Sequence, residues 1–274
     1  MVGFWQPQQM VMSPEMKAQI EEYYAEFSSY GLFTTASDKL AGFLVISMLL
    51  LTLLTPKVFN LEHQFTFYAS YHNNFFNKLI HFLCIWPIFW TSLVFFAHTS
   101  PIHNLPDILQ SMLDMIPAQY NQYMVPDWSA IVADFYCIYY LVLDPAGGMV
   151  AAALVGFCYT TAQMFTQGYW ETVIRPEIPI DFVQGLSAGQ AALVLHVTAW
   201  LFQFWGHGIH EGRAPALTKN PAQAFLMAPY FVLLEVLSIF GYQAELHERV
   251  HKKVIANIAQ FDADAAAKKN KKSN

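Results

Sequence analysis

The chain has 274 residues, of which 55% are hydrophobic and only 12% are charged, whereas roughly 25% of the residues of an ordinary soluble domain are charged. This composition excludes a disordered chain and argues against an ordinary soluble enzyme. The formal net charge is −6, and because nucleic-acid binding needs clustered basic residues, we expect no nucleic-acid partner.

Charged residues are also unevenly distributed along the chain. Asp, Glu, Lys and Arg are absent from residues 79–106, 145–170 and 182–210. Each of these gaps is longer than the roughly 20 residues that cross the hydrocarbon core of a bilayer. The pattern therefore predicts a protein with several helices in a membrane.

The first expected helix lies near the N-terminus. Residues 1–38 are polar and mixed, and they lack the basic start and early apolar run of a signal peptide. Residues 39–57 contain the apolar stretch FLVISMLLLTLL. We therefore expect a polar N-terminal segment over 1–38, followed by an extra hydrophobic helix over 39–57.

Five further apolar segments follow within an expected membrane-embedded domain of residues 58–244. Residues 99–127 are rich in Pro and Asp and are expected to form a loop outside the membrane. The segment 129–143 is short, and Asp144 and Pro145 separate it from the segment 145–165, so these two segments are a candidate re-entrant hairpin. The expected helices cover residues 79–97, 129–143, 145–165, 188–206 and 222–241. With the first helix they predict an all-α, polytopic membrane helix bundle of about five to six hydrophobic helices.

The C-terminal residues 245–274 are charged, helix-forming and end in a run of lysines. A solvated basic tail is the simplest interpretation. The last four residues also resemble the K-K-x-x signal by which coat proteins return membrane proteins to the endoplasmic reticulum. Clustered lysines favour a cytosolic tail, so we expect a multi-pass protein of the endoplasmic-reticulum membrane. The signal residues are Lys271, Lys272, Ser273 and Asn274.

Histidines gather at two places, at the entrance to the expected helix 79–97 and along the expected helix 188–206. At about 100° per residue, the polar side chains of the second group lie on one face of an otherwise apolar helix. A single histidine such as His196 is usually a hydrogen-bonded core residue, but ionisable groups in a membrane helix commonly mark a functional site. The first group is His72, Asn77 and His81, and the second is His196, Gln203, His207, His210 and Glu211.

The spacing within these groups suits a metal ion. His207 shares a helix face with His210 and Glu211, which follow it by three and four residues. The chain passes an even number of expected helices between the two groups, so both emerge on the same side of the membrane. Imidazole ligands without thiolates suit iron, zinc, copper or nickel rather than magnesium or calcium. Zinc would favour hydrolysis, whereas iron with open positions would favour oxygen chemistry.

The first group adds a condition on where its helix begins. His72 and His81 are nine residues apart, which places them on opposite sides of a straight helix. They can therefore share a metal ion only if the helix begins after His72, for example near Asn74.

Three sequence blocks around these residues resemble the family of endoplasmic-reticulum 2-hydroxy fatty acid dioxygenases. They are YHNNFFNKLIHFLCIWP at 71–87, WLFQFWGHGIHEGRAPAL at 200–217 and LMAPYFVLLEVL at 226–237. The resemblance implies iron(II)-dependent α-oxidation, in which O2 and a 2-hydroxy long-chain fatty acid give the acid one carbon shorter, as in the degradation of phytosphingosine and other sphingolipids. Residues 58–244 would then be the dioxygenase-like domain.

The resemblance also implies which residues hold the Fe(2+) ion. His72, His81 and His207 fall on the family's histidines and would bind the metal. His210 departs from the family pattern, which usually has an apolar or aromatic residue there, and it is a candidate further ligand that would replace one lost elsewhere. Asn73 stands where the fungal member has a second consecutive histidine.

Other positions would support these ligands. Glu211 would act with the three histidines in catalysis, while Asn77, Gln203 and His196 would hydrogen-bond the metal-binding imidazoles and orient them. Arg213 would bind the substrate carboxylate through its guanidinium group, although an anchor at the membrane interface is an equally good interpretation of this arginine.

Three alternatives from other classes remain open at this point. A haem oxidoreductase would need facing histidines on two helices, for which His81 and His196 qualify. A di-iron desaturase or hydroxylase would need H-x-x-x-H boxes, and only His247 and His251 match, on a segment where a solvated helix face is the simpler interpretation. The last alternative is a non-enzymatic membrane scaffold or transporter subunit.

Overall fold

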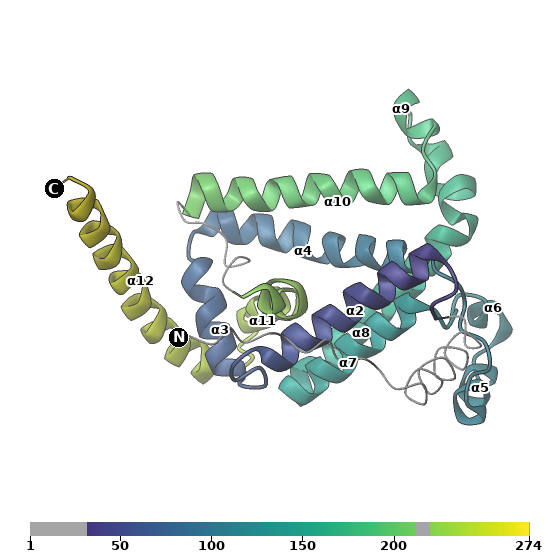
Figure 1. Cartoon of the computed structure of the whole chain (residues 1–274), viewed down its shortest axis with the longest axis horizontal. Coiled ribbons are helices and arrows are strands. Elements are labelled where there is room, and N and C mark those ends of the chain that lie inside the picture. The colour runs from purple at the N-terminus through teal and green to yellow at the C-terminus, as the bar shows by residue number, and fades with distance from the viewer. Residues whose placement is uncertain (1–31, 212–219, 274) are drawn as a thin grey trace, which may run out of the picture.

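The computed structural model of the chain describes residues 32–211 and 220–273, and within these ranges it consists of helices and connecting turns without a strand (Figure 1). The all-α prediction is therefore confirmed. Arg213, Asn274 and most of the polar segment 1–38 lie outside the described residues.

Eight helices make up most of the described structure, and shorter elements connect them. The eight are α2 (Ala36–Leu54), α3 (Leu61–Tyr71), α4 (Phe75–Phe96), α7 (Trp128–Leu143), α8 (Pro145–Met164), α10 (Ala188–Trp205), α11 (Ala228–Ile239) and α12 (Ala244–Ser273). The shorter elements are α5 (Asp107–Asp114), α6 (Ala118–Asn121), η1 (Phe165–Ile174), η2 (Arg175–Glu177), α9 (Asp181–Gln184), η3 (Gly206–Glu211) and η5 (Gln223–Met227).

All the expected hydrophobic segments are helical, but fewer of them have the length and hydropathy of a membrane span. In the described part of the chain, three helices qualify, and a fourth is added if one pair bent by 116° counts as a single span. This number is lower than the expected five to six, because α7 has only 16 residues and α10 carries polar glutamine and histidine side chains. The three are Ala36–Leu54, Phe75–Phe96 and Pro145–Glu177, and the bent pair is Gln223–Ile239 with Ala244–Phe261.

Some helices were not expected from the sequence. Residues 61–71 form α3, and the expected loop 99–127 contains α5 and α6. α3 is short, and the side chain of Asn60, which precedes it, accepts a hydrogen bond from the His63 N–H (2.8 Å) and so caps the helix.

α7 and α8 form the expected hairpin, which turns at Asp144. A side chain at Gly148 would meet the backbone carbonyl of Tyr140, so glycine allows α8 to approach α7 closely. The Asp144 carboxylate accepts hydrogen bonds from the hydroxyls of Tyr230 (2.6 Å) and Tyr242 (2.9 Å), which bind the hairpin to α11 and the turn after it. A re-entrant placement of this hairpin in a membrane stays a prediction.

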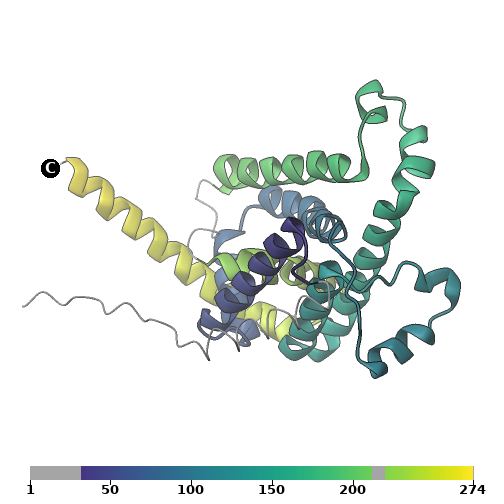
Figure 2. The ribbon, with the colours of Figure 1, turned by 45° about the vertical axis from the view of Figure 1, so that its right-hand side comes forward.

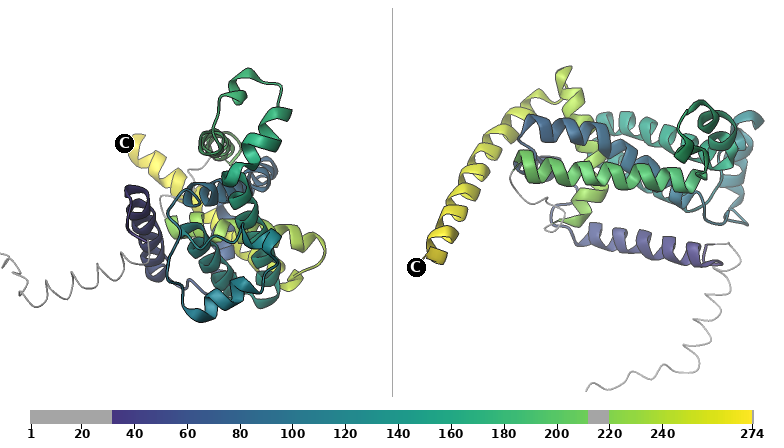
Figure 3. Two further views of the ribbon diagram at one scale, coloured as in Figure 1. Left: turned by 90° about the vertical axis from the view of Figure 1, so that its right-hand side faces the viewer. Right: turned by 90° about the horizontal axis from the view of Figure 1, so that it is seen from above.

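α4 is the central helix of the bundle. It packs against α7, α8, α10 and α11, and it runs beside α10 (Figures 1 and 3). Lys78 near its start forms an ion pair with Glu235 of α11 (3.2 Å), which gives the acidic side chain of an apolar helix a partner. α2 lies along one side of the bundle (Figure 3).

α3 is held in place by α12, whose C-terminal part projects away from the bundle (Figure 2). Glu62 of α3 pairs with Arg249 (3.0 Å) and Lys253 (2.6 Å) of α12. The Asn257 amide donates to the hydroxyl of Ser70 (3.0 Å), the last residue but one of α3. These bonds fix both ends of α3, and the first of the grouped histidines follows its second end.

Candidate metal centre

Three imidazoles from two distant parts of the chain meet inside the bundle. His72 follows the last residue of α3, His81 lies in α4, and His207 lies in η3, directly after α10. Their side chains are only 6%, 3% and 4% exposed, and one nitrogen of each ring lies within 4.8 Å of the others. The fold thus brings together both histidine groups of the sequence.

The break between α3 and α4 makes this meeting possible. Asn74 is the N-cap of α4 and accepts hydrogen bonds from the N–H groups of Phe76 (2.9 Å) and Asn77 (3.3 Å). The helix therefore starts after His72, as the nine-residue spacing requires. His72 turns back from the connecting segment to face His81 across 4.3 Å between ring centroids.

The hydrogen bonds of His72 and His81 define which nitrogen carries the proton. Nδ1 of His72 bonds the Tyr68 carbonyl oxygen (2.7 Å), and Nδ1 of His81 bonds the Asn77 carbonyl oxygen (2.8 Å). A carbonyl only accepts, so each Nδ1 is protonated and each neutral ring has a lone pair on Nε2. These two Nε2 atoms lie 3.0 Å apart, an unfavourable approach of two lone pairs unless a cation lies between them.

The observed distances fit a bound transition-metal ion. Two nitrogens about 2.1 Å from one ion and about 90° apart are separated by about 3.0 Å, which is the spacing between His72 and His81. His207 completes the set, because its Nδ1 is buried and has no hydrogen-bond partner among the described residues. Burial and the neighbouring His81 and His207 hold the pKa of His72 well below its usual value, so this ring stays in the neutral form that binds metals.

Glu211 links the two histidine-bearing segments. Its carboxylate accepts hydrogen bonds from the backbone N–H groups of Asn73 (3.2 Å) and Asn74 (3.0 Å) and from the side-chain amide of Asn77 (3.2 Å). The negative charge lies at the N-terminus of α4, where the helix dipole favours it. These contacts favour a positioning role for Glu211 over the catalytic role expected from the sequence.

Gly206 allows η3 to approach α4 closely enough for this link. A side chain at Gly206 would meet Oδ1 of Asn77 at 2.7 Å and Cδ1 of Ile80 at 3.1 Å. The side chain of Asn77, predicted to support the imidazoles, therefore fills the space beside Gly206 and reaches Glu211, while its backbone carbonyl holds His81.

The structure keeps His210 apart from the three imidazoles. Residues 206–211 form a π-helix, whose i→i+5 hydrogen bonds widen the turn, so side chains three residues apart no longer share one face. The His210 ring packs against Phe76 (5.3 Å) and Trp205 (4.9 Å) instead. The expectation of a shared face assumed a regular α-helix.

His196 also lies away from the imidazole cluster, although it was expected to support it. Its Nε2 accepts a hydrogen bond from the Trp200 indole N–H (3.0 Å), and its Nδ1 bonds the Thr91 hydroxyl (2.7 Å). Both ring nitrogens therefore have partners. Thr91 lies ten residues after His81 on α4, about 15 Å along the helix, so His81 and His196 do not face one another as two haem ligands would.

Two buried polar groups line a small pocket of about 50 Å³ beside the three histidines. Gln203 is 4% exposed, and its amide nitrogen has no hydrogen-bond partner among the described residues. Tyr68 is 2% exposed, its ring stacks on His72 with centroids 4.1 Å apart, and its hydroxyl likewise has no partner there. Tyr68 was missed in the sequence because α3 was not expected; its position four residues before His72 would have placed it on the same helix face.

The histidines of the C-terminal H-x-x-x-H box lie elsewhere. His247 packs edge-on against Phe65 at 5.0 Å, and His251 is exposed. Neither belongs to the group of three buried histidines, so this box gives no support to a di-iron site.

The fold and this cluster define an all-helical, apolar protein with a buried site of three histidines. A family model described as 2-hydroxy-palmitic acid dioxygenase Mpo1-like matches residues 58–239, and the chain therefore belongs to the Mpo1-like family. It is 28% identical over 187 residues to 2-hydroxy-palmitic acid dioxygenase MPO1 of Saccharomyces cerevisiae, covering 68% of this chain and 85% of the yeast protein. No solved structure matches the chain. The family match begins after α2 and ends with α11.

Removal of one imidazole should weaken metal binding. We expect His72→Ala, His81→Ala and His207→Ala each to lower iron(II) affinity at least about tenfold, because each removes a nitrogen that faces the common centre. His210→Ala is the matched control and should bind iron as the unaltered protein does. The iron(II) affinity is measured by metal analysis of detergent-purified protein after equilibrium dialysis. If His210→Ala loses as much iron(II) affinity as the other three variants, the three-histidine site is contradicted.

A methyl group at Gly206 should disturb the site without removing any ligand. We expect Gly206→Ala to lower iron(II) affinity about tenfold, the size of effect seen when groups behind metal ligands are lost, because the new Cβ displaces Asn77. Gly208→Ala is the control, since nothing lies within 4 Å of a Cβ there. If the two alanine variants bind iron equally well, the close approach of η3 to α4 does not matter for the site.

Proposed function

We propose that this protein is a membrane-embedded, iron(II)-dependent dioxygenase that converts 2-hydroxy long-chain fatty acids into the fatty acid one carbon shorter. The main support is the cluster of His72, His81 and His207 inside the segment that matches a dioxygenase family. The yeast relative is named for 2-hydroxy-palmitic acid, and the same substrate class is proposed for this chain.

The proposed reaction balances without a further reductant. An acid R–CH(OH)–COOH and O2 give R–COOH, CO2 and H2O, with cleavage of the bond between C1 and C2. The acid gives up four electrons, and one O2 accepts four. An iron(II) ion bound by the three imidazoles would provide open positions at which O2 is activated to react with a closed-shell acid.

The side chains around the site would bind and orient the acid. Burial raises the pKa of the Tyr68 hydroxyl, with smaller contributions from the charges of Glu235 and Glu211, so the hydroxyl keeps its proton and can donate it in a hydrogen bond. The Gln203 amide is a second buried donor, and it has no hydrogen-bond partner in the described part of the chain. Hydrogen bonds to a carboxylate are stronger than those between neutral groups, and Arg213, outside the described residues, is proposed as a further carboxylate partner.

The surroundings suit a lipid substrate. Three to four helices of the described chain are long and apolar enough to cross a membrane, and a site among them keeps an alkyl chain out of water. We include in the proposal the endoplasmic-reticulum membrane as location and coat-protein recognition of Lys271 and Lys272. A role in sphingolipid degradation follows from the 2-hydroxy acid that phytosphingosine yields.

The central test is product formation. Detergent-purified protein supplied with iron(II), O2 and 2-hydroxypalmitate should form pentadecanoate, whereas palmitate, which lacks the hydroxyl, should not be shortened. Product analysis by gas chromatography and mass spectrometry decides the outcome. No pentadecanoate with iron, together with tight binding of zinc, would contradict an iron dioxygenase.

Loss of the unpaired donors should reduce turnover while leaving the metal in place. We expect Tyr68→Phe and Gln203→Leu each to lower kcat/KM for 2-hydroxypalmitate by roughly 10- to 100-fold, the value of a hydrogen bond to a charged group. Iron content should be unchanged, because neither side chain is among the three grouped ligands. Tyr169→Phe, at an exposed tyrosine, is the control and should keep full activity.

A further inference from the structure

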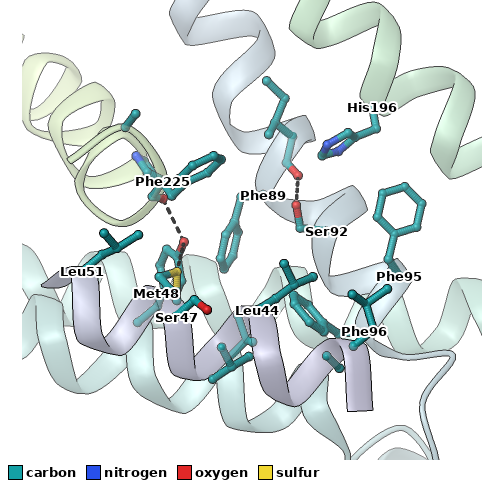
Figure 4. Close-up of a pocket in the computed structure, with 18 of the residues that line it drawn as sticks. Leu44, Ser47, Met48, Leu51, Phe89, Ser92, Phe95, Phe96, His196 and Phe225 are labelled. Carbon is teal, nitrogen blue, oxygen red and sulfur yellow. Dashed lines mark hydrogen bonds between the residues drawn. The ribbon is translucent and has the colours of Figure 1, made fainter. Parts of the chain in front are cut away.

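A second, larger cavity of about 510 Å³ lies between α2, α4, α7, α10 and the segment of residues 222–229 (Figure 4). Its volume falls in the range of small-molecule sites, about 300–1,000 Å³. Leu44 and Met48 of α2 face Phe89 and Phe96 of α4 across it. No Asp, Glu, Lys or Arg is among its described lining residues, so the cavity suits an uncharged, apolar ligand or ligand part.

This cavity adjoins the pocket beside the three histidines. Ile85, Trp200 and Ala224 line both spaces. Trp200 is held at this junction by its hydrogen bond to His196 (3.0 Å), and His196 is held in turn by Thr91 (2.7 Å). The two spaces are therefore neighbours that share these lining residues.

The cavity extends along α4 away from the histidines. Lining residues of α4 run from Ile85 to Phe96, about 16 Å along the helix axis. A ligand that enters from the histidines would thus have its polar end at Tyr68 and Gln203 and its extended apolar part beside α4. An unbranched alkyl chain with a carboxyl end has this shape and this distribution of polarity.

We propose that this cavity binds the alkyl chain of the 2-hydroxy fatty acid and that α2 forms the wall which limits the length of that chain. The proposal rests on the function proposed above. It extends that function to a helix outside the matched family segment, since the match starts at residue 58 and α2 ends at Leu54.

α2 is fixed firmly enough to act as a wall. Its first turn is bonded to the segment that follows α4, because the Asp38 carboxylate accepts hydrogen bonds from the Ser100 N–H (2.8 Å) and hydroxyl (2.9 Å). Ala41 and Val45 are 4% and 3% exposed, so one face of the helix is buried in the bundle. Ser47, on the same helix, lines the cavity (Figure 4) and leaves room that a larger residue would fill.

The test compares chain lengths in variants of α2. We expect Ser47→Phe to lower kcat/KM for 2-hydroxypalmitate at least about tenfold while turnover of 2-hydroxyoctanoate stays within about twofold. Ile46→Phe is the control, because it introduces the same ring at the adjacent position, which is 48% exposed and does not line the cavity. It should leave the activity toward both substrates unchanged. If Ser47→Phe leaves the ratio of kcat/KM for 2-hydroxypalmitate to kcat/KM for 2-hydroxyoctanoate unchanged, the proposal is overturned.

A binding measurement separates this proposal from the proposed reaction. 2-Hydroxypalmitate with a diazirine near its methyl end, irradiated with the full-length, unaltered protein, should label peptides of α2 and α4, and unlabelled 2-hydroxypalmitate should prevent the labelling. Such labelling without pentadecanoate formation would support the alkyl-chain site and reject the reaction. Labelling confined to segments that do not line the cavity, or displaced by dioleoyl phosphatidylcholine but not by 2-hydroxypalmitate, would overturn the alkyl-chain site.

Discussion

The approach of two imidazole nitrogens to 3.0 Å in a buried site is the constraint on which the described architecture of this centre depends. Both rings are neutral and aim lone pairs at each other, an arrangement that a cation between them would stabilise. Several separate features of the fold bring the imidazoles this close together. α4 begins after His72, Gly206 leaves room for Asn77, and Glu211 fastens η3 to the start of α4. Each feature brings one ligand-bearing segment toward the others.

Sequence reasoning could identify the two histidine groups because histidines in apolar segments are rare, and the family resemblance singled out His72, His81 and His207, which the structure brings together. It also required the start of α4 near Asn74, which the structure has. It could not foresee the π-helix at residues 206–211, because a change of helix type depends on packing against α4 rather than on local propensity. His210 was therefore expected on the wrong face, and Tyr68 was overlooked with the short helix that carries it.

The number of possible membrane spans was overestimated for a related reason. Apolar composition predicts that a helix is buried, but it does not distinguish burial in lipid from burial in protein. α7 and α10 are covered partly by α8 and α4, and their polar residues face other helices: Thr91 bonds His196, and Tyr140 bonds the Leu226 carbonyl. The bundle thus provides partners for polar groups that would be costly in lipid.

The carbonyls that hold His72 and His81 belong to residues four positions earlier in the same local segment. Each ring is therefore oriented by its own helical turn, before any contact with the other half of the site forms. Little side-chain entropy remains to be lost when an ion binds, and the rings have little freedom to move apart for a large ion. The site should thus favour ions that accept nitrogen ligands at short distance and discriminate against calcium by geometry as well as by ligand type.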